Sequence, residues 1–305
     1  MSNIFEKISE SKVKLQQFSS NQYVQGSKQF LESNSIVAKF AFLILILIVF
    51  MMLMSLGSFI LSTLFTKDHN PVLIDGMINS KQLIIIPQDP SKRGAKPIYR
   101  SNNEREGIEF TWSVWINIDD YTYKESEYKH VFHKGNDNIP TTNAGEGVKG
   151  INFPNNSPGL YITPINLDSV NGNTAGLLIN MNSFTKIDER IEIKNIPLNK
   201  WVNVIIRVTK QKQLDVYISG TLVKRHILNG VPKQNYGDVY VSMNGGFSGN
   251  TSELRYFEKA ISTSKIQSIV NKGPNKKFVA DMNIGKDDTN KYLSTQWFLQ
   301  TAQDV

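Results

Sequence analysis

Acidic residues are the first candidates for chemistry, and one short segment concentrates them. Asp188, Glu189 and Glu192 lie within five residues on an expected β-strand. Glycosidases work with two carboxyl groups that face one cleft. Side chains on a strand alternate between its faces, so Glu189 and Glu192, three residues apart, should point in opposite directions. This spacing disfavours a hydrolase.

Histidine and cysteine offer no better catalytic pattern. His130 and His133 are also three apart on an expected strand, so we expect them on opposite faces rather than on one metal ion. The chain has no cysteine, and no Ser-His-Asp arrangement is recognisable by spacing. The sequence therefore predicts no catalytic residue and no zinc site.

Two oxygen-rich segments and one tyrosine-bearing loop are the candidates for binding. Asp137 and Asn138, and also Asn250 with Glu253, offer the carboxylate and amide oxygens that calcium prefers, although plain Asx-type turns are the favoured explanation. The loop from Asp119 to Glu127 carries two tyrosines, Tyr121 and Tyr123. Exposed tyrosines stack on sugar rings or contact proteins, and the sequence does not choose between these ligands.

An uncharged segment near the N-terminus predicts a membrane anchor. Residues 40–66 contain no Asp, Glu, Lys, Arg or His, and Lys39 and Lys67 flank them. About 27 helical residues extend about 40 Å, which exceeds the roughly 30 Å of a bilayer core. The arm before this segment carries five lysines against three glutamates, which favours a cytosolic N-terminus and a translocated C-terminal domain. The absence of cysteine neither proves nor excludes an oxidising compartment.

The remaining chain divides by pattern. Residues 1–39 form an arm that is either an amphipathic helix or a loosely ordered polar tail. Residues 67–107 are expected to be a linker with short strands, at Val72 to Ile74 and Leu83 to Ile86. Residues 108–273 are the expected domain, and residues 274–305 a C-terminal extension.

Strand patterns dominate residues 108–273. From Phe110 to Ile118, apolar and mostly polar positions alternate, which is typical of a half-buried antiparallel strand. Many further short strands follow, separated by Gly- and Asn-containing turns. One helix is expected after Ser262, which can cap it, and before Gly273. We therefore predict an all-β, antiparallel jelly-roll sandwich preceded by a single transmembrane helix.

The net charge of +7 and the isoelectric point near 9.3 would suit an anionic partner. The basic residues are nevertheless scattered, and their loose groups lack the interleaved aromatic residues that stack on bases. We therefore expect a solvated surface and no nucleic-acid binding.

Four segments, in order, resemble the laminin G-like or concanavalin A-like lectin and glucanase jelly roll. They are FTWSVWINI, HVFHKGND, LNKWVNVIIRVTKQKQLDVYISGTLV and FSGNTSELRYFEKAISTSKIQSI. The anchor followed by PQDPSKRGAKPIYRSNNEREGIEFTWSVWI is also similar to membrane-anchored proteins of nucleocytoplasmic large DNA viruses. The first resemblance implies a sandwich that holds calcium at its rim in many members, and here Ser252-Glu253 replaces the family's more usual acidic pair.

Together these features predict a non-enzymatic, membrane-tethered recognition or structural protein. The alternative, which the jelly-roll resemblance implies, is a glucanase-like carbohydrate-active enzyme with atypical carboxylates. Its expected partners are the membrane and either a glycan or a protein, bound through loops of the sandwich. The viral resemblance further implies capsid or envelope partners and a place in the inner membrane of a virion, where the chain would act as a scaffold.

Overall fold

The computed structural model describes residues 29, 36–65, 69–101, 103–142, 147–165 and 175–279. The chain forms two units, residues 1–67 and residues 68–305. Residues 1–28 of the N-terminal arm, where an amphipathic helix and a polar tail are the two alternatives, lie outside the described residues, and so does the C-terminal extension beyond residue 279.

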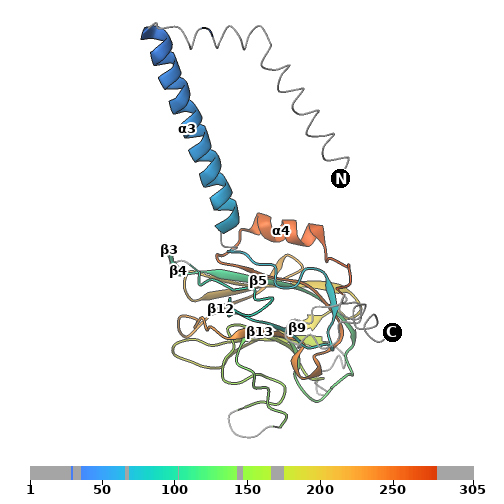
Figure 1. Cartoon of the computed structure of the whole chain (residues 1–305). Helices are drawn as coiled ribbons and strands as arrows, with labels where there is room; N and C mark the ends of the chain where they lie inside the picture. Colours follow the sequence, from blue (N-terminus) through green and yellow to red (C-terminus); the bar gives the residue numbers. More distant parts are fainter. Residues whose placement is uncertain are drawn as a thin grey trace, which may run out of the picture. The chain divides into compact units, whose positions relative to one another are not determined.

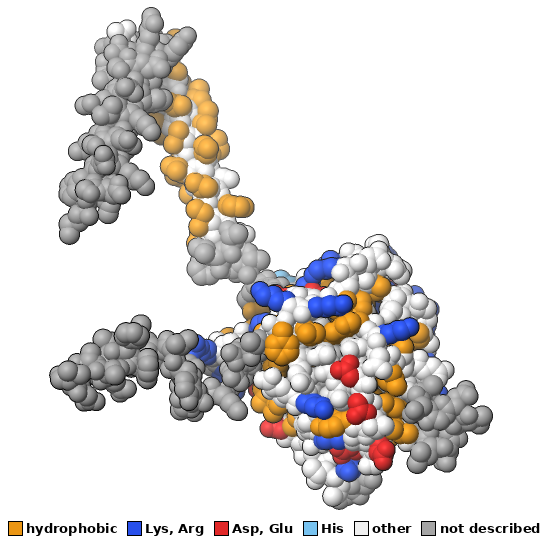
Figure 2. Space-filling model, turned by 90° about the vertical axis from the view of Figure 1, so that its right-hand side faces the viewer, with side chains coloured by type: hydrophobic (Ala, Val, Ile, Leu, Met, Phe, Trp, Pro, Cys, Tyr) orange, Lys and Arg blue, Asp and Glu red, His pale blue; other side chains and the backbone are white. Residues whose placement is uncertain are grey.

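The N-terminal unit contains the apolar helix α3, Ile36–Phe65. Leu, Ile, Val, Phe and Met side chains cover its surface over residues 36–62 (Figure 2). Among the described residues it is the one helix long and apolar enough to cross a membrane, by length and composition. It matches the segment predicted as the anchor.

The C-terminal unit is a sandwich of two antiparallel six-stranded sheets, as far as the chain is described (Figure 1). Sheet A has the order β1 (Met77–Asn79), β14 (Ser248–Phe257), β5 (Phe110–Asp120), β10 (Trp201–Thr209), β11 (Gln213–Ile218) and β12 (Thr221–Ile227). Sheet B has the order β2 (Ile84–Ile86), β13 (Asp238–Val241), β6 (Lys129–Gly135), β7 (Gly159–Ile162), β8 (Ala175–Met181) and β9 (Glu189–Ile196). A small hairpin pairs β3 (Asn103–Glu104) with β4 (Gly107–Ile108). The predicted all-β sandwich is confirmed.

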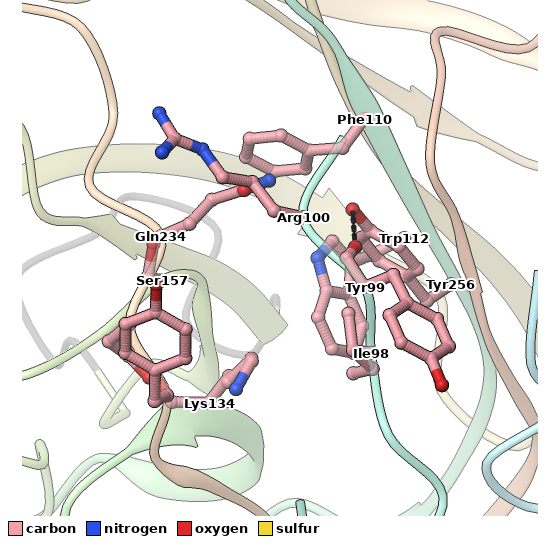
Figure 3. Close-up of a pocket in the computed structure, with 11 residues that line it drawn as sticks. Ile98, Tyr99, Arg100, Phe110, Trp112, Lys134, Ser157, Gln234 and Tyr256 are labelled. Carbon is pink, nitrogen blue, oxygen red and sulfur yellow. Dashed lines mark hydrogen bonds between the residues drawn. The ribbon is translucent and has the colours of Figure 1, made fainter. Parts of the chain in front are cut away.

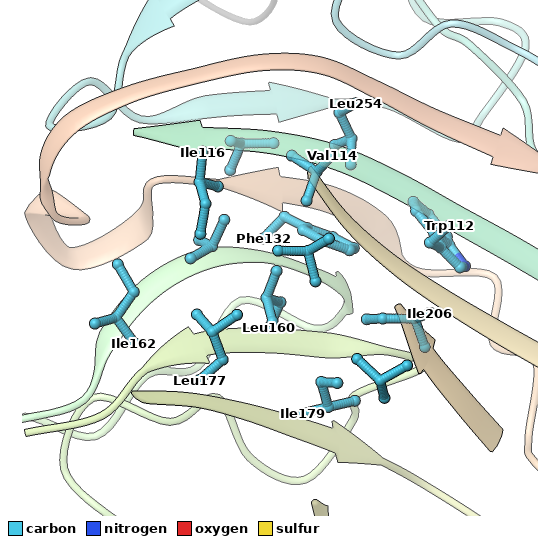
Figure 4. Packing of buried hydrophobic residues seen from close by; sticks show 14 of the residues in the cluster. Trp112, Val114, Ile116, Phe132, Leu160, Ile162, Leu177, Ile179, Ile206 and Leu254 are labelled. Atoms are coloured by element: carbon cyan, nitrogen blue, oxygen red, sulfur yellow. The ribbon is translucent and has the colours of Figure 1, made fainter. Parts of the chain in front are cut away.

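The core lies between the sheets and follows the predicted alternation. Phe110, Trp112, Val114 and Ile116 point inward from β5 and are at most 2% exposed. Sheet B supplies facing side chains such as Phe132, whose ring stacks on Trp112 with centroids 5.3 Å apart (Figure 4). Burial of this apolar area is the main stabilising contribution to the sandwich.

The segment expected as a linker takes part in both sheets. β1 pairs with β14, and β2 pairs with β13, so residues 69–107 supply one edge strand to each sheet. Leu73 and Ile74 are fully buried, although only Val72 of that expected strand forms a β-bridge. On the other side of β1, Phe278 forms a parallel bridge with Met77.

The predicted helix is confirmed as α4, Thr263–Lys272. The Ser262 hydroxyl caps it by accepting a hydrogen bond from the Lys265 backbone N–H, and Gly273 ends it. Ile266 of α4 packs on the outer face of sheet A in a small apolar cluster with Ile205, Tyr217, Phe257 and Ile261.

Candidate functional site

Two adjoining cavities at one end of the sandwich form a hollow that we name the cleft. The inner cavity has a volume of about 50 Å³ and the outer one about 390 Å³. They share four lining residues, Ile98, Lys134, Asn235 and Tyr236. The inner cavity is also lined by Tyr99, Arg100, Phe110, Trp112, Ser157, Gln234 and Tyr256, and the outer one by Gln88, Asp89, Lys92 and Asp238.

Aromatic residues of sheet A form one wall of the inner cavity. Phe110 and Trp112 come from β5 and Tyr256 from the neighbouring β14, and Trp112 packs edge-on against Tyr256 with centroids 5.3 Å apart. The Tyr256 hydroxyl donates to the backbone carbonyl of Tyr99 at 3.2 Å. Figure 3 shows this wall facing Lys134, Ser157 and Gln234 across the cavity. The core of the sandwich thus continues into the floor of the cleft.

Close backbone packing fixes the opposite wall. A side chain on Gly135 would collide with the Asn155 carbonyl oxygen, and one on Gly237 would collide with the Gly135 carbonyl oxygen. Between these contacts, the Lys134 ammonium donates to the Gly237 carbonyl at 2.6 Å, and Asn235 Nδ2 donates to the Lys134 carbonyl at 2.9 Å. The cleft is therefore largely preformed.

Burial and charge shape the electrostatics of the cleft. Lys134 is only 6% exposed, and burial lowers its pKa to about 8, although the Asp238 carboxylate opposes this shift. Asp238 also accepts a hydrogen bond from the Gln88 backbone N–H at 2.8 Å. Hydrogen bonds from the backbone and hydroxyl of Ser91 lower the pKa of Asp89, so this carboxyl stays ionised at neutral pH.

Three groups at the cleft are open to a ligand. The Gln234 Oε1 atom is buried and has no hydrogen-bond partner. Arg100 is exposed, and no carboxylate in the described part of the chain pairs with it. Tyr236 is 92% exposed at the mouth of the cleft. An unpaired buried acceptor is costly, so it favours a donor from a bound molecule or from water.

Comparison with known proteins adds similar folds but no family. No family model matches the chain, and no curated protein matches it. The receptor binding domain of botulinum neurotoxin D matches with a TM-score of 0.41 and 13% identity, covering 67% of this chain and 44% of that one. The binding domain of Paraclostridial Mosquitocidal Protein 1 matches with a TM-score of 0.40 and 17% identity, covering 68% and 46%.

A third similar structure is the binding domain of botulinum neurotoxin DC in complex with SialylT, with a TM-score of 0.37 and 15% identity over 54% of this chain and 35% of that one. The chain thus spans less than half the length of these neighbours.

The structure places the two predicted ligand tyrosines outside the cleft. Tyr121 is only 4% exposed, and its hydroxyl donates to the backbone carbonyls of Thr163 and Pro164. Its ring therefore lies inside the sandwich rather than on a loop surface. Tyr123 is half-buried, and its hydroxyl donates to the Gly245 carbonyl at 3.1 Å. Tyr236, which no sequence pattern singled out, is the exposed tyrosine at the cleft.

The four candidate calcium ligands fall in two separate places. Asp137 and Asn138 are exposed and follow β6 of sheet B, whereas Asn250 and Glu253 belong to β14 of sheet A. The Glu253 carboxylate is 4% exposed and accepts a hydrogen bond from the Lys272 ammonium at 2.9 Å. The described residues contain no group of three or more His, Asp or Glu side chains that could hold a metal ion.

The acidic strand segment behaves as its spacing predicts. On β9, Glu189 is buried and Glu192 is exposed, so the two carboxylates do not share a face. Glu189 accepts hydrogen bonds from the Ser183 hydroxyl at 2.6 Å and from the Asn229 backbone N–H at 3.0 Å. These contacts give Glu189 a structural role between β9 and the segment after β12.

The expectation that His130 and His133 point to opposite faces is wrong. The pairing of β6 with β7 shifts register between His130 and Phe132, which is a β-bulge. The extra residue returns both histidines to the outer face of sheet B, where His130 Nε2 lies 2.6 Å from His133 Nδ1. The Met243 backbone N–H donates to His130 Nδ1, so His130 Nε2–H must donate to His133. His133 Nε2–H then donates to the Asn136 carbonyl at 2.8 Å.

Asparagines and a tyrosine continue this buried arrangement, which we name the His–Asn network: His130, His133, Asn152, Asn156 and Tyr161. The Tyr161 hydroxyl donates to Asn156 Oδ1, and Asn156 Nδ2 donates to the Asn152 carbonyl at 2.6 Å. All five side chains are at most 1% exposed. The network ties residues 136–138 and 152–156 to the outer face of sheet B, and its five side chains hold no open ligand group.

Proposed function

We propose that this chain is a non-enzymatic, membrane-tethered recognition module that binds a saccharide in the cleft. The observation that supports it best is a preformed depression of about 390 Å³ with the exposed Tyr236 ring at its mouth. Small-molecule sites are concave, about 300–1,000 Å³ in volume, and combine apolar walls with a few placed polar groups. The aromatic wall and the polar rim of the cleft fit this description.

The cleft suits a saccharide better than a protein as its ligand. Stable protein interfaces bury roughly 1,200–2,000 Å² in total and are broader than such a depression. The outer cavity offers donors from Lys92, Lys134 and Asn235 and acceptors from Asp89 and Asp238. Sugar hydroxyls both donate and accept hydrogen bonds, and the apolar face of a sugar ring can stack on a tyrosine ring.

The alternative of a carbohydrate-active enzyme has less support. A glycosidase needs one carboxylic acid whose pKa is raised so that it can protonate the leaving group. Hydrogen bonds shift the pKa of Asp89 in the opposite direction. We therefore expect the chain to bind its saccharide without producing new reducing ends.

The proposed anchor is helix α3, with the N-terminus in the cytosol and the sandwich across the membrane. Tethering raises the effective concentration of neighbouring binding sites, so individually weak saccharide contacts suffice for adhesion. Protease treatment of sealed membranes tests this topology. Digestion of the sandwich only after the membrane has been opened would contradict outward display.

Capsid or envelope partners and a place in the inner membrane of a virion rest on the sequence resemblance alone. Detection of the chain in purified particles, and its retention with capsid components after detergent treatment, would support them. Its absence from particles would leave the saccharide proposal intact and remove the viral one.

Binding of the full chain in lipid nanodiscs to a glycan array tests the proposed function. We expect binding to a defined set of glycans and an affinity about tenfold lower for Tyr236→Ala, because loss of a stacking ring at a binding hot spot costs about 1 kcal/mol or more. Phe184→Ala is the matched control, because Phe184 is also an exposed aromatic residue, at 69%, and does not line the cleft. Equal binding by Tyr236→Ala and the native chain would contradict the proposal.

A further inference from the structure

The charges around the two cavities are unevenly distributed. The inner cavity is lined by two basic residues, Arg100 and Lys134, and by no acidic residue. The acidic residues of the cleft, Asp89 and Asp238, line only the outer cavity, together with Lys92. A ligand group that enters the inner cavity therefore meets positive charge and the aromatic wall.

The donors and acceptors of the inner cavity are incompletely used. The Lys134 ammonium has three N–H donors, and the Gly237 carbonyl accepts one of them. A buried ammonium with a single neutral partner is poorly compensated for lost hydration. On the same wall, Gln234 Oε1 is an unpaired acceptor (Figure 3). An anionic acceptor would therefore pair with Lys134, and a hydroxyl donor beside it would pair with Gln234 Oε1.

The size of the inner cavity limits this anion. A volume of about 50 Å³ holds a small group only, about three to five water-sized atoms. A carboxylate has three heavy atoms, and the outer cavity leaves room for the ring that carries it.

We propose that the ligand of the cleft is a sugar acid whose carboxylate enters the inner cavity and binds Lys134 and Arg100, while a neighbouring hydroxyl donates to Gln234 Oε1. This inference rests on the proposed saccharide function and narrows its ligand class. The ring of the sugar then lies in the outer cavity beside Tyr236, where Asp89, Asp238 and Asn235 meet its remaining hydroxyls.

The pH dependence follows from the groups that face Lys134. Burial lowers the pKa of Lys134 to about 8. The Asp238 carboxylate stabilises the charged ammonium and partly opposes this shift. The other charged side chains that line the cleft are Asp89, Lys92 and Arg100, and burial raises the pKa of the Tyr256 hydroxyl in the wall. The preference for the acidic ligand should therefore fall as the pH rises above about 8, since Lys134 then loses its proton.

Two matched probes test the inference: methyl glucuronide and methyl glucoside, which differ by a carboxylate in place of a hydroxymethyl group. Calorimetric titration of the full chain in nanodiscs should give at least about tenfold tighter binding of the glucuronide. Lys134→Gln should remove this preference, so that the variant binds the two probes with equal affinity. Lys129→Gln is the control, because Lys129 is a second buried lysine with a pKa lowered to about 8 and lies outside the cleft lining.

The outcomes separate this inference from the function on which it rests. Equal binding of both probes, or binding of the glucoside alone, would overturn the sugar-acid assignment and leave saccharide binding in place. No binding of either probe or of any glycan on the array would overturn both. Two further results would overturn it. One is a preference for the glucuronide that survives in Lys134→Gln. The other is binding of inorganic sulfate as tight as that of the glucuronide, because the inner cavity would then not recognise the carboxylate of a sugar. Circular dichroism establishes that each variant is folded.

Discussion

Two regions beside strand β6 bury polar side chains, and they differ in how completely these side chains are paired. In the His–Asn network, each ring nitrogen of His130 and His133 has a partner in one consistent tautomeric arrangement. In the cleft, Lys134 has one partner and Gln234 Oε1 has none. His133 and Lys134 are thus consecutive residues of one strand, but the polar atoms of His133 are fully paired and those of Lys134 are not.

The difference separates structure from binding. A fully paired buried network stabilises one conformation and has nothing left to offer a ligand. A cavity with unpaired groups is less favourable in the absence of a ligand, and a ligand that supplies the missing partners recovers this free energy. We therefore expect changes in the network to alter stability, and changes in the cleft to alter affinity.

The largest expected effect is the loss of stability of the network in acid. Burial lowers the pKa of His133 to about 4 and that of His130 well below its ordinary value, so the unfolded chain binds more protons between about pH 6.5 and pH 4. Stability should be fully present above about pH 6.5 and fall by roughly 3 kcal/mol towards pH 4 through His133 alone. Thermal unfolding of the full chain in detergent, followed by tryptophan fluorescence across this range, measures it.

His133→Gln isolates this effect from the titration of carboxylates, because it removes the titrating ring. We expect a lower stability at neutral pH and a flatter dependence on pH than in the native chain. Parallel profiles for the two proteins would show that the histidine pair does not control the acid response.

The next effect is that of Asn156→Ala. The substitution leaves the Tyr161 hydroxyl and the Asn152 carbonyl without their partner in a buried place, which should cost roughly 2–3 kcal/mol. The melting temperature should fall accordingly, and the glycan affinity of the folded protein should stay unchanged. Asn271→Ala on the exposed face of α4 is the control and should alter stability by less than about 0.5 kcal/mol. A loss of affinity in Asn156→Ala without loss of stability would break the distinction between the two regions.

Gln234→Leu should show the reverse pattern. It removes the unpaired acceptor and also the amide that interacts with the Tyr256 hydroxyl, so the two effects oppose each other and stability should change by less than about 1 kcal/mol. Affinity for the array glycans should fall several-fold, since a ligand hydroxyl loses its acceptor. Equilibrium binding and melting temperature, measured on the same preparation, check both expectations. A loss of stability comparable to that of Asn156→Ala would instead show that Gln234 stabilises the fold, as the residues of the His–Asn network do.

The smallest expected effect is that of calcium. Two of the candidate ligands, Asp137 and Asn138, follow β6 of sheet B, whereas Glu253 belongs to sheet A and its carboxylate already pairs with Lys272. A cation bound to the folded state alone would raise stability by about 2.7 kcal/mol at a hundredfold excess over its dissociation constant. We expect no such rise when calcium replaces a chelator, with magnesium as the control. A clear calcium-specific increase in melting temperature would instead support the predicted site.

Local sequence patterns predicted the parts of the fold that depend on local periodicity. The alternation from Phe110 to Ile118 predicted β5, and the Ser262 cap with Gly273 predicted α4, because each signal lies within one element. Strands β1 and β2 are only three residues long, and their places at the edges of the sheets depend on distant partners in β14 and β13. Short patterns do not carry that information.

The bulge in β6 left a signal that the simple strand rule overlooks. Val131 and Phe132 are adjacent, and both are buried in the core, which interrupts the two-residue period. Two consecutive large apolar residues between two histidines would have indicated an inserted residue. The cleft gave no comparable signal, because Ile98, Lys134 and Gln234 come from three distant segments and share no motif.

The close contact of Gly135 and Gly237 has a consequence for tracing the ancestry of this chain. Any side chain at either position would collide with backbone, so the two glycines should persist in relatives even where the ligand has changed. Lys134 and Asn235 can vary more freely, since their contacts are made by side-chain atoms and depend on the ligand. A relative that keeps both glycines but has another residue in place of Lys134 would therefore share this scaffold and bind a neutral ligand.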